Sequence, residues 1–192
     1  MKEKLILVTG GARSGKSEFA EKFMRAYTCK TAYIATAEIL DEEMRERINM
    51  HKLRRLDDFW LNFEAPYAAH ELLRSLPPEA EGVLFDCLTL YVSNMLYKDY
   101  QVKSFDEKIQ TVKESISLLA QAARDSKRTV LFVTNEVGLG IVPDNELARE
   151  YRDIIGWVNQ WLAEQCDHVF FTVCGQAVDV KKLAFKLPNV EE

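Results

Sequence analysis

A glycine-rich segment near the amino terminus has the residue types and spacing of a phosphate-binding loop. Gly10 is followed by four residues and then by Gly15, Lys16 and Ser17, which completes the pattern G-x-x-x-x-G-K-S. The glycines let the backbone curl so that successive N–H groups point at phosphate oxygens. Lys16 is expected to reach the β- and γ-phosphates, and the Ser17 hydroxyl to ligate Mg²⁺. The predicted cradle comprises Gly10, Gly11, Ala12, Arg13, Ser14, Gly15, Lys16 and Ser17.

Asp86 is a second residue with a predicted role in nucleotide chemistry. It ends the apolar run Val83-Leu84-Phe85, where a carboxylate can face a bound metal ion directly or through water. Taken alone, it is explained equally well as a cap for a helix beginning near Cys87. The phosphate-binding pattern upstream favours the metal role. Together the two motifs indicate nucleoside-triphosphate chemistry without specifying the group transferred or its acceptor.

These residues must be positioned by the elements around them. Apolar runs of strand length occur along the whole chain, and they are nearly continuous rather than alternating, which is typical of parallel strands covered on both faces. The runs are Leu5 to Thr9, Thr31 to Ala35, Gly82 to Asp86, Thr129 to Thr134 and His168 to Val173. Helical periodicity is predicted between them, over 105–124, 145–165 and a charged stretch from Asp41 toward His51.

The alternation of strands and helices predicts an α/β fold of the P-loop NTPase (RecA-like) type, with a mainly parallel central sheet flanked by helices. The chain has 192 residues, of which 47% are hydrophobic, enough for one sizeable core, so residues 1–192 are expected to form a single domain. The apolar run from Leu5 to Val8 is too short for a signal peptide or a membrane span. A cytoplasmic protein without a membrane span is therefore expected.

Charge and cysteine usage narrow the class of partner. The formal net charge of -5 gives no general basic footprint for nucleic acid, so a small-molecule partner is favoured. The four cysteines are scattered without metal-ligand spacing and are expected to be reduced core residues. They are Cys29, Cys87, Cys166 and Cys174.

Further short motifs follow the cradle in order over most of the chain. They are Tyr33 to Thr36, Asp41 to Met44, Arg47-Ile48, His51-Lys52, Asp86 to Thr89, Val133 to Gly138, Gly140 to Pro143, Leu147 to Arg149, Arg152-Asp153, Gly156 and Asn159-Gln160. With the cradle, this set resembles the bifunctional adenosylcobinamide kinase/adenosylcobinamide-phosphate guanylyltransferase family of cobalamin biosynthesis. Two segments depart from that family: Leu56 stands where proline is usual, and Asn62 stands where threonine is usual.

The resemblance implies two reactions in one chain. The first is phosphorylation, by ATP or GTP, of the hydroxyl on the aminopropanol arm of adenosylcobinamide. The second is transfer of GMP from GTP onto that phosphate through a histidine adduct, whose position in this sequence is His51. The resemblance also implies nucleotide contacts from Lys52, Leu53, Arg54 and Arg55, and a homo-oligomer, specifically a trimer.

The residues around His51 leave two interpretations open. Helical spacing places it beside Ile48 and Met44, and the cations at 47, 52, 54 and 55 favour its neutral imidazole and can hold charge on an α-phosphate. The alternative is an ordinary polar residue at a helix end with a solvated basic face, and the residues alone favour that alternative. The resemblance favours the nucleophile. His70 and His168 both lie in patterns typical of structural positions.

Other site residues are predicted with plain alternatives beside them. Ala35, Thr36 and Ala37 follow a parallel strand, so their backbone is expected to border the nucleotide crevice, or else to form a simple turn. The resemblance implies that Glu64 binds the guanosine ribose; the alternative is an exposed loop carboxylate. The two glycines of the loop from Glu136 to Pro143 suggest a loop that faces a corrinoid or a subunit, or a flexible connection.

Two other functions fit the cradle. One is a kinase of a different small molecule, because a P-loop with a strand-end carboxylate serves any phosphoryl acceptor. The other is a non-enzymatic GTP switch, for which an Asn-Lys-x-Asp guanine motif is expected. Asn135 is followed instead by Glu136-Val137-Gly138, and the motif occurs nowhere in the chain.

Overall fold

The computed structural model describes residues 3–38, 57–99 and 104–185. Within them one seven-stranded sheet has the order β3-β2-β4-β5-β1-β6-β7. Neighbouring strands are parallel from β3 to β6, and β7 is antiparallel to β6. The strands are β1 (Leu5–Gly10), β2 (Thr31–Ala35), β3 (Trp60–Glu64), β4 (Gly82–Asp86), β5 (Thr129–Val133), β6 (His168–Val173) and β7 (Gln176–Asp179).

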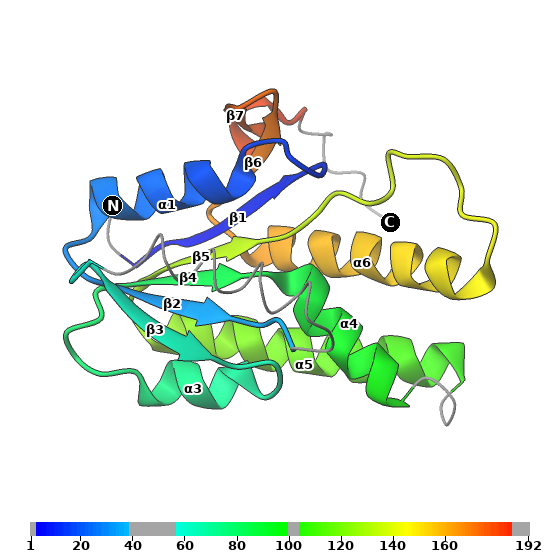
Figure 1. Ribbon diagram of the computed structural model, residues 1–192, viewed down its shortest axis with the longest axis horizontal. Helices are drawn as coiled ribbons and strands as arrows, with labels where there is room; N and C mark the ends of the chain where they lie inside the picture. Colours follow the sequence, from blue (N-terminus) through cyan, green and yellow to red (C-terminus); the bar gives the residue numbers. More distant parts are fainter. Residues whose placement is uncertain (1–2, 39–56, 100–103, 186–192) are drawn as a thin grey trace, which may run out of the picture.

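Helices cover both faces of the sheet, as a parallel sheet requires. Figure 1 shows α1 on one side and α3, α4, α5 and α6 on the other. The helices are α1 (Lys16–Tyr27), α3 (Ala69–Ser75), α4 (Leu88–Asp99), α5 (Phe105–Asp125), α6 (Glu146–Gln165) and the short α7 (Val180–Leu183). The observed layers confirm the predicted α/β P-loop fold.

The two cores divide according to the alternation of side chains along the strands. On the α1 face, Ile6 and Val8 pack with Phe23 and Met24 of the helix. On the opposite face, Leu5 and Leu7 join the larger core beneath α3 to α6. Both sides of each central strand are therefore buried, which accounts for the nearly continuous apolar runs in the sequence.

Local capping fixes the starts of the two long helices. The Ser104 side chain accepts a hydrogen bond from the Glu107 backbone N–H, while the Glu107 carboxylate accepts one from the Ser104 backbone, which forms a capping box at α5. The Asn145 side chain accepts from the Ala148 N–H at the start of α6. Buried stripes then hold the helices to the sheet, with Ile116 and Leu119 in α5 and Ile154, Val158 and Leu162 in α6.

The predicted strands and the helices over 105–124 and 145–165 are confirmed within one or two residues, whereas β3 and β7 were not predicted. The expectation that all four cysteines lie in the core is wrong for Cys29 and Cys174, which are exposed; Cys87 and Cys166 are buried, and all four are free thiols. The predicted helix beginning at Asp41 lies outside the described residues. Among those residues, no helix combines the length and apolar character needed to cross a membrane.

The capping box generates a stability prediction. Ser104→Ala removes both the side-chain acceptor for the Glu107 N–H and the hydroxyl bond to the Glu107 carboxylate, so the free energy of unfolding should fall by about 1 kcal/mol. Urea unfolding followed by circular dichroism measures this loss. The matched control is Ser117→Ala, an exposed position within the same helix, which should change stability by less than about 0.5 kcal/mol. Equal losses in the two variants would contradict the capping role.

Candidate functional site

The parallel register brings most of the predicted site residues to one edge of the sheet. Ala35 at the end of β2 pairs with Glu64 on one side and with Asp86 on the other. Asp86 in turn pairs with Val133 of β5, and β1 ends beside β5 at Gly10, where the predicted cradle starts. The carboxyl ends of these strands therefore form one continuous edge, as is usual for nucleotide sites in open α/β sheets.

The cradle connects β1 to α1 through residues 11–15, and α1 begins at Lys16. Gly15 has φ 97° and ψ 5°, a left-handed conformation that favours glycine, and a Cβ there would lie 3.0 Å from the Gly175 Cα. The Lys16 ammonium folds back to donate to the Gly11 carbonyl at 2.8 Å. The loop thus has the curled backbone and the helix start that bind phosphate in P-loop proteins.

Lys16 is the charged centre of this loop. Its side chain is largely buried, and this burial lowers its pKa, while the neighbouring Cys87 and Asp86 act in the opposite direction. Asp86 therefore lies close enough to interact electrostatically with the cradle lysine. A bound phosphate would add negative charge beside Lys16 and favour its charged form further.

Asp86 is oriented from the neighbouring strand. The Tyr33 hydroxyl donates to the Asp86 Oδ2 at 3.0 Å, and Tyr33 is itself buried on β2, with its ring edge-on to Trp60. Tyr33 pairs with Leu84 in the sheet, two residues before Asp86, so the two side chains lie on the same face as α1. This arrangement supports the interpretation of Asp86 as the strand-end carboxylate of the nucleotide site.

Thr36 has a structural function at the same edge. It is fully buried; its hydroxyl donates to the Cys87 carbonyl at 2.7 Å and accepts from the Cys87 N–H at 2.8 Å. The Asn94 amide of α4 donates to the Thr36 carbonyl at 2.7 Å and to the Pro66 carbonyl at 3.1 Å. These bonds hold residues 35–37 against the start of α4. The Thr36 hydroxyl is thereby engaged with the backbone of Cys87.

A second polar network joins the start of α4, the segment after β5 and α6, and sequence reasoning missed it. The Asn135 amide donates to the Thr89 hydroxyl at 2.8 Å, and the Tyr151 hydroxyl donates to the Thr89 carbonyl at 3.0 Å. The Asn159 amide donates to the Asn135 carbonyl at 3.2 Å. The available signal was a polar residue shortly after each of two apolar strands, Thr89 after one and the run Thr134 to Glu136 after the other.

The remaining predicted residues are Glu64, the segment from His51 to Arg55, and His168. Glu64 is exposed at the end of edge strand β3, where it is a strand residue rather than a loop carboxylate. His51, Lys52, Leu53, Arg54 and Arg55 lie outside the described residues, so their placement stays a prediction. The Nδ1 of His168 on β6 forms a hydrogen bond of 2.8 Å with the Oδ2 of Asp179 on β7. This contact agrees with the predicted structural position of His168.

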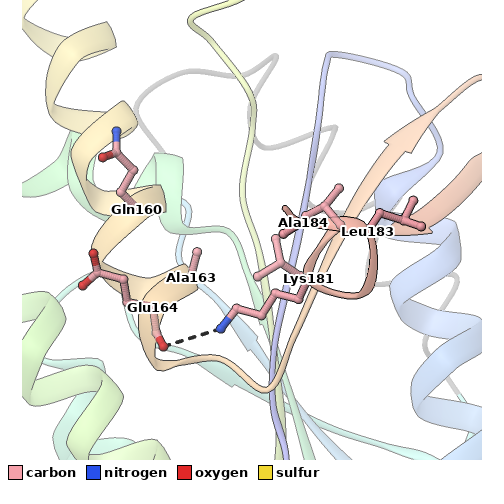
Figure 2. Close-up of a pocket in the computed structure, with 8 residues that line it drawn as sticks. Gln160, Ala163, Glu164, Lys181, Leu183 and Ala184 are labelled. Atoms are coloured by element: carbon pink, nitrogen blue, oxygen red, sulfur yellow. Dashed lines mark hydrogen bonds between the residues drawn. The ribbon is translucent and has the colours of Figure 1, made fainter. Parts of the chain in front are cut away.

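A groove of about 620 Å³ lies elsewhere, between α6 and the segment from β6 to α7. Figure 2 shows Gln160, Ala163 and Glu164 on the helix facing Lys181, Leu183 and Ala184. The Lys181 ammonium donates to the Glu164 carbonyl at 3.5 Å and to the Cys166 carbonyl. The groove lies near Val169, at the amino end of β6, and none of the predicted site residues lines it.

The family described as Cobinamide kinase / cobinamide phosphate guanyltransferase matches residues 6–180. The bifunctional adenosylcobalamin biosynthesis protein CobU of Escherichia coli strain K12 is 40% identical over 92% of this chain and 99% of its own length. CobU of Salmonella typhimurium strain LT2 is 39% identical over the same shares of the two chains. CobP of Pseudomonas aeruginosa is 38% identical over 91% of this chain and 96% of its own. A solved KaiC-like protein from Pyrococcus horikoshii OT3 aligns with a TM-score of 0.48 at 12% identity, covering 88% of this chain and 71% of that one.

The lowered pKa of Lys16 predicts how triphosphate binding depends on pH. Below that pKa the lysine is charged before and after binding; above it, binding must take up a proton, so affinity should fall as pH rises. The fall should begin at a lower pH than the usual lysine range. Titration with ATP from neutral into alkaline pH measures it, because adenine, unlike guanine, does not lose a proton there. A flat affinity across that range would contradict a buried, charge-bearing Lys16.

Proposed function

The chain belongs to the cobinamide kinase / cobinamide phosphate guanyltransferase family, and we propose that its one phosphate cradle serves both reactions. The chain phosphorylates adenosylcobinamide and then guanylylates the phosphate in adenosylcobalamin biosynthesis. The observation that supports a shared site is the single sheet edge, where the cradle, Ala35, Glu64 and Asp86 lie in register. The family assignment replaces the two other functions, a kinase of a different molecule and a GTP switch.

In the kinase reaction, the cradle N–H groups and Lys16 hold the β- and γ-phosphates of ATP or GTP. The oxygen of the cobinamide hydroxyl attacks the γ-phosphorus; a new P–O bond forms, and the bond to the β-phosphate oxygen breaks. The hydroxyl proton leaves to solvent, and the nucleoside diphosphate is the leaving group. Little covalent participation by the protein is needed, because positioning and charge stabilisation supply most of the catalysis.

Ser17 and Asp86 fit a magnesium site. Both offer hard oxygen donors, which Mg²⁺ prefers, and Asp86 is already held by Tyr33 beside the cradle. No group of three or more His, Cys, Asp or Glu side chains suited to a metal occurs in the described part of the chain. This agrees with the usual binding of Mg²⁺ through one or two protein oxygens, water and nucleotide phosphates. Bound there, Mg²⁺ would neutralise charge on the β- and γ-phosphates.

In the guanylyl transfer, a nitrogen of His51 attacks the α-phosphorus of GTP; a P–N bond forms, and pyrophosphate leaves. A phosphate oxygen of adenosylcobinamide phosphate then attacks the same phosphorus, and the P–N bond breaks. Two displacements replace one difficult transfer. Lys52, Arg54 and Arg55 hold the developing phosphate charge, Leu53 and the segment 35–37 line the nucleotide, and Glu64 binds the ribose.

The proposal also covers the substrates, the cellular location and the oligomeric state. The corrinoid adenosylcobinamide is the acceptor, GTP and ATP are the nucleotides, and the protein acts in the cytoplasm as a homotrimer. These assignments rest on the family resemblance. The guanine preference is read without an Asn-Lys-x-Asp motif, since Asn135 is held by Thr89 and followed by Glu136.

Asp86→Asn should weaken the effect of Mg²⁺ more than nucleotide binding itself, because the amide keeps the shape of the side chain while the negative charge is lost. Nucleotide affinity measured without metal should stay within about twofold of wild type, while the Mg²⁺ concentration for half-maximal kinase rate should rise by at least about tenfold. The control Asp125→Asn removes a carboxylate at the end of α5, far along the chain from the cradle. An unchanged Mg²⁺ requirement in Asp86→Asn would contradict the metal-binding role and leave Asp86 with a structural one.

His51→Ala should separate the two reactions. Phosphorylation needs the cradle, the metal and an aligned hydroxyl, so it should persist, whereas GMP transfer should collapse by more than about a hundredfold because the attacking nitrogen is gone. Incubation with GTP and adenosylcobinamide, with both products quantified, tests this. GTP labelled at the α-phosphate should also leave a base-stable, acid-labile label on the wild type and on the control, and none on His51→Ala. The matched control is His70→Ala in α3; label on another residue would refute the assignment.

A further inference from the structure

The turn between β6 and β7 lies against the phosphate cradle. Thr172 near the end of β6 is almost fully buried, and its hydroxyl donates to the Thr9 carbonyl at 3.1 Å. The same hydroxyl lies 2.9 Å from the Ser14 Oγ in the cradle. A hydroxyl has one proton, so a Thr172 that donates to Thr9 must accept from Ser14. The Ser14 proton is therefore directed at the hairpin and away from a bound phosphate.

Backbone contacts reinforce this side-chain pair. The Gly175 N–H, in the turn, donates to the Ser14 carbonyl at 2.9 Å. At the start of the loop, a Cβ on Gly10 would lie 2.4 Å from the Thr172 Oγ1, and at its end a Cβ on Gly15 would meet Gly175. Both glycines of the phosphate pattern thus pack against the hairpin, and a Cβ on either would press on it.

The hairpin has its own fastening to the sheet. β6 pairs with β1 from Ile6 to Gly10, and Gly10 lies directly opposite Thr172. At the far end, His168 and Asp179 form a 2.8 Å hydrogen bond across the two strands. Burial raises the pKa of Asp179, but the hydrogen bond and charge of His168, aided by Lys182, outweigh it and hold the pKa below its usual range.

We infer that the β6–β7 hairpin holds the cradle in its nucleotide-binding shape before the nucleotide arrives, and that Thr172 is a positioning residue of the nucleotide site. The inference rests on the proposed use of the cradle to bind nucleotide. Because Thr172 and Gly175 already hold the loop through these bonds, nucleotide binding does not have to order it. The hydroxyl of Thr172 joins the Thr9 carbonyl of β1 to Ser14 in the middle of the loop.

Thr172→Val is the direct test, because valine keeps the branched shape and removes the hydroxyl. Loss of two hydrogen bonds should weaken binding of ATP and of GTP by about tenfold in the absence of corrinoid. The nucleotide KM should rise by a similar factor while kcat at saturation stays near wild type, since the loop still closes on the bound nucleotide. Amide exchange should become faster in the cradle.

Two further variants separate the hydroxyl from general packing. Thr172→Ser retains the hydroxyl and should restore most of the affinity. Thr31→Val is the matched control: Thr31 is a fully buried strand threonine at the opposite, amino end of β2, where its hydroxyl pairs with that of Thr28 at 2.7 Å. It should leave nucleotide affinity unchanged.

The outcomes are distinguishable. Wild-type affinity and exchange in Thr172→Val would overturn the inference, and so would an equal loss in Thr172→Ser, which would implicate side-chain volume. If Thr172→Val does not fold, Ser14→Ala removes the donor of the same bond from the loop side and should weaken nucleotide binding in the same direction; an unchanged affinity would then overturn it. Failure of wild-type protein to bind any nucleotide would instead refute the proposed function.

Discussion

The in-register parallel pairing of β2, β4, β5 and β1 is the constraint on which the candidate site depends. Ala35 and Asp86 are paired residues, and so are Asp86 and Val133. The ladder continues past the strand ends, because the Thr134 N–H donates to the Val8 carbonyl at 2.9 Å and the Glu136 N–H to the Gly10 carbonyl at 3.0 Å. The loops that follow these strands therefore begin at the same edge of the sheet. A shift of β4 by one residue in the register would turn the Asp86 side chain to the opposite face.

Several buried polar side chains at this edge are hydrogen-bonded within the protein. Thr36, Thr89 and Asn94 are buried, and each has a hydrogen-bond partner within the edge. An unsatisfied buried polar group is costly, so a network of this kind rigidifies the elements that it joins. The buried thiol of Cys87 is part of it, and burial raises its pKa to about 11, so it stays protonated beside Asp86. The scaffold is thus rigid where substrates must be aligned.

The parts of this structure that the sequence could predict are local ones. The cradle is a contiguous pattern, and the five predicted strands are recognisable as apolar runs, four of which, β1, β2, β4 and β5, are buried on both faces. β3 and β7 were not recognised: each is an edge strand with half-exposed side chains, and β7 has four residues. Tyr33 reads as one more apolar strand residue until the register places its hydroxyl beside Asp86. Ser14 and Thr172 are 158 residues apart in sequence, so no window of neighbouring residues could reveal their contact. The exposure of Cys174 likewise follows from the β6–β7 turn that the sequence did not indicate.

The position of β1 in the sheet has a consequence for biosynthesis of the chain. β1 ends at Gly10, whereas its two neighbours in the sheet, β5 and β6, begin at Thr129 and His168. A nascent chain that ends before Thr129 offers β1 no partner strand, and one that ends before Gly175 lacks the turn that contacts Ser14 and Gly15. Contacts so distant along the chain form late and slow folding. The cradle is therefore translated before the hairpin that contacts it, and during synthesis it gains these contacts only after Gly175 has been added.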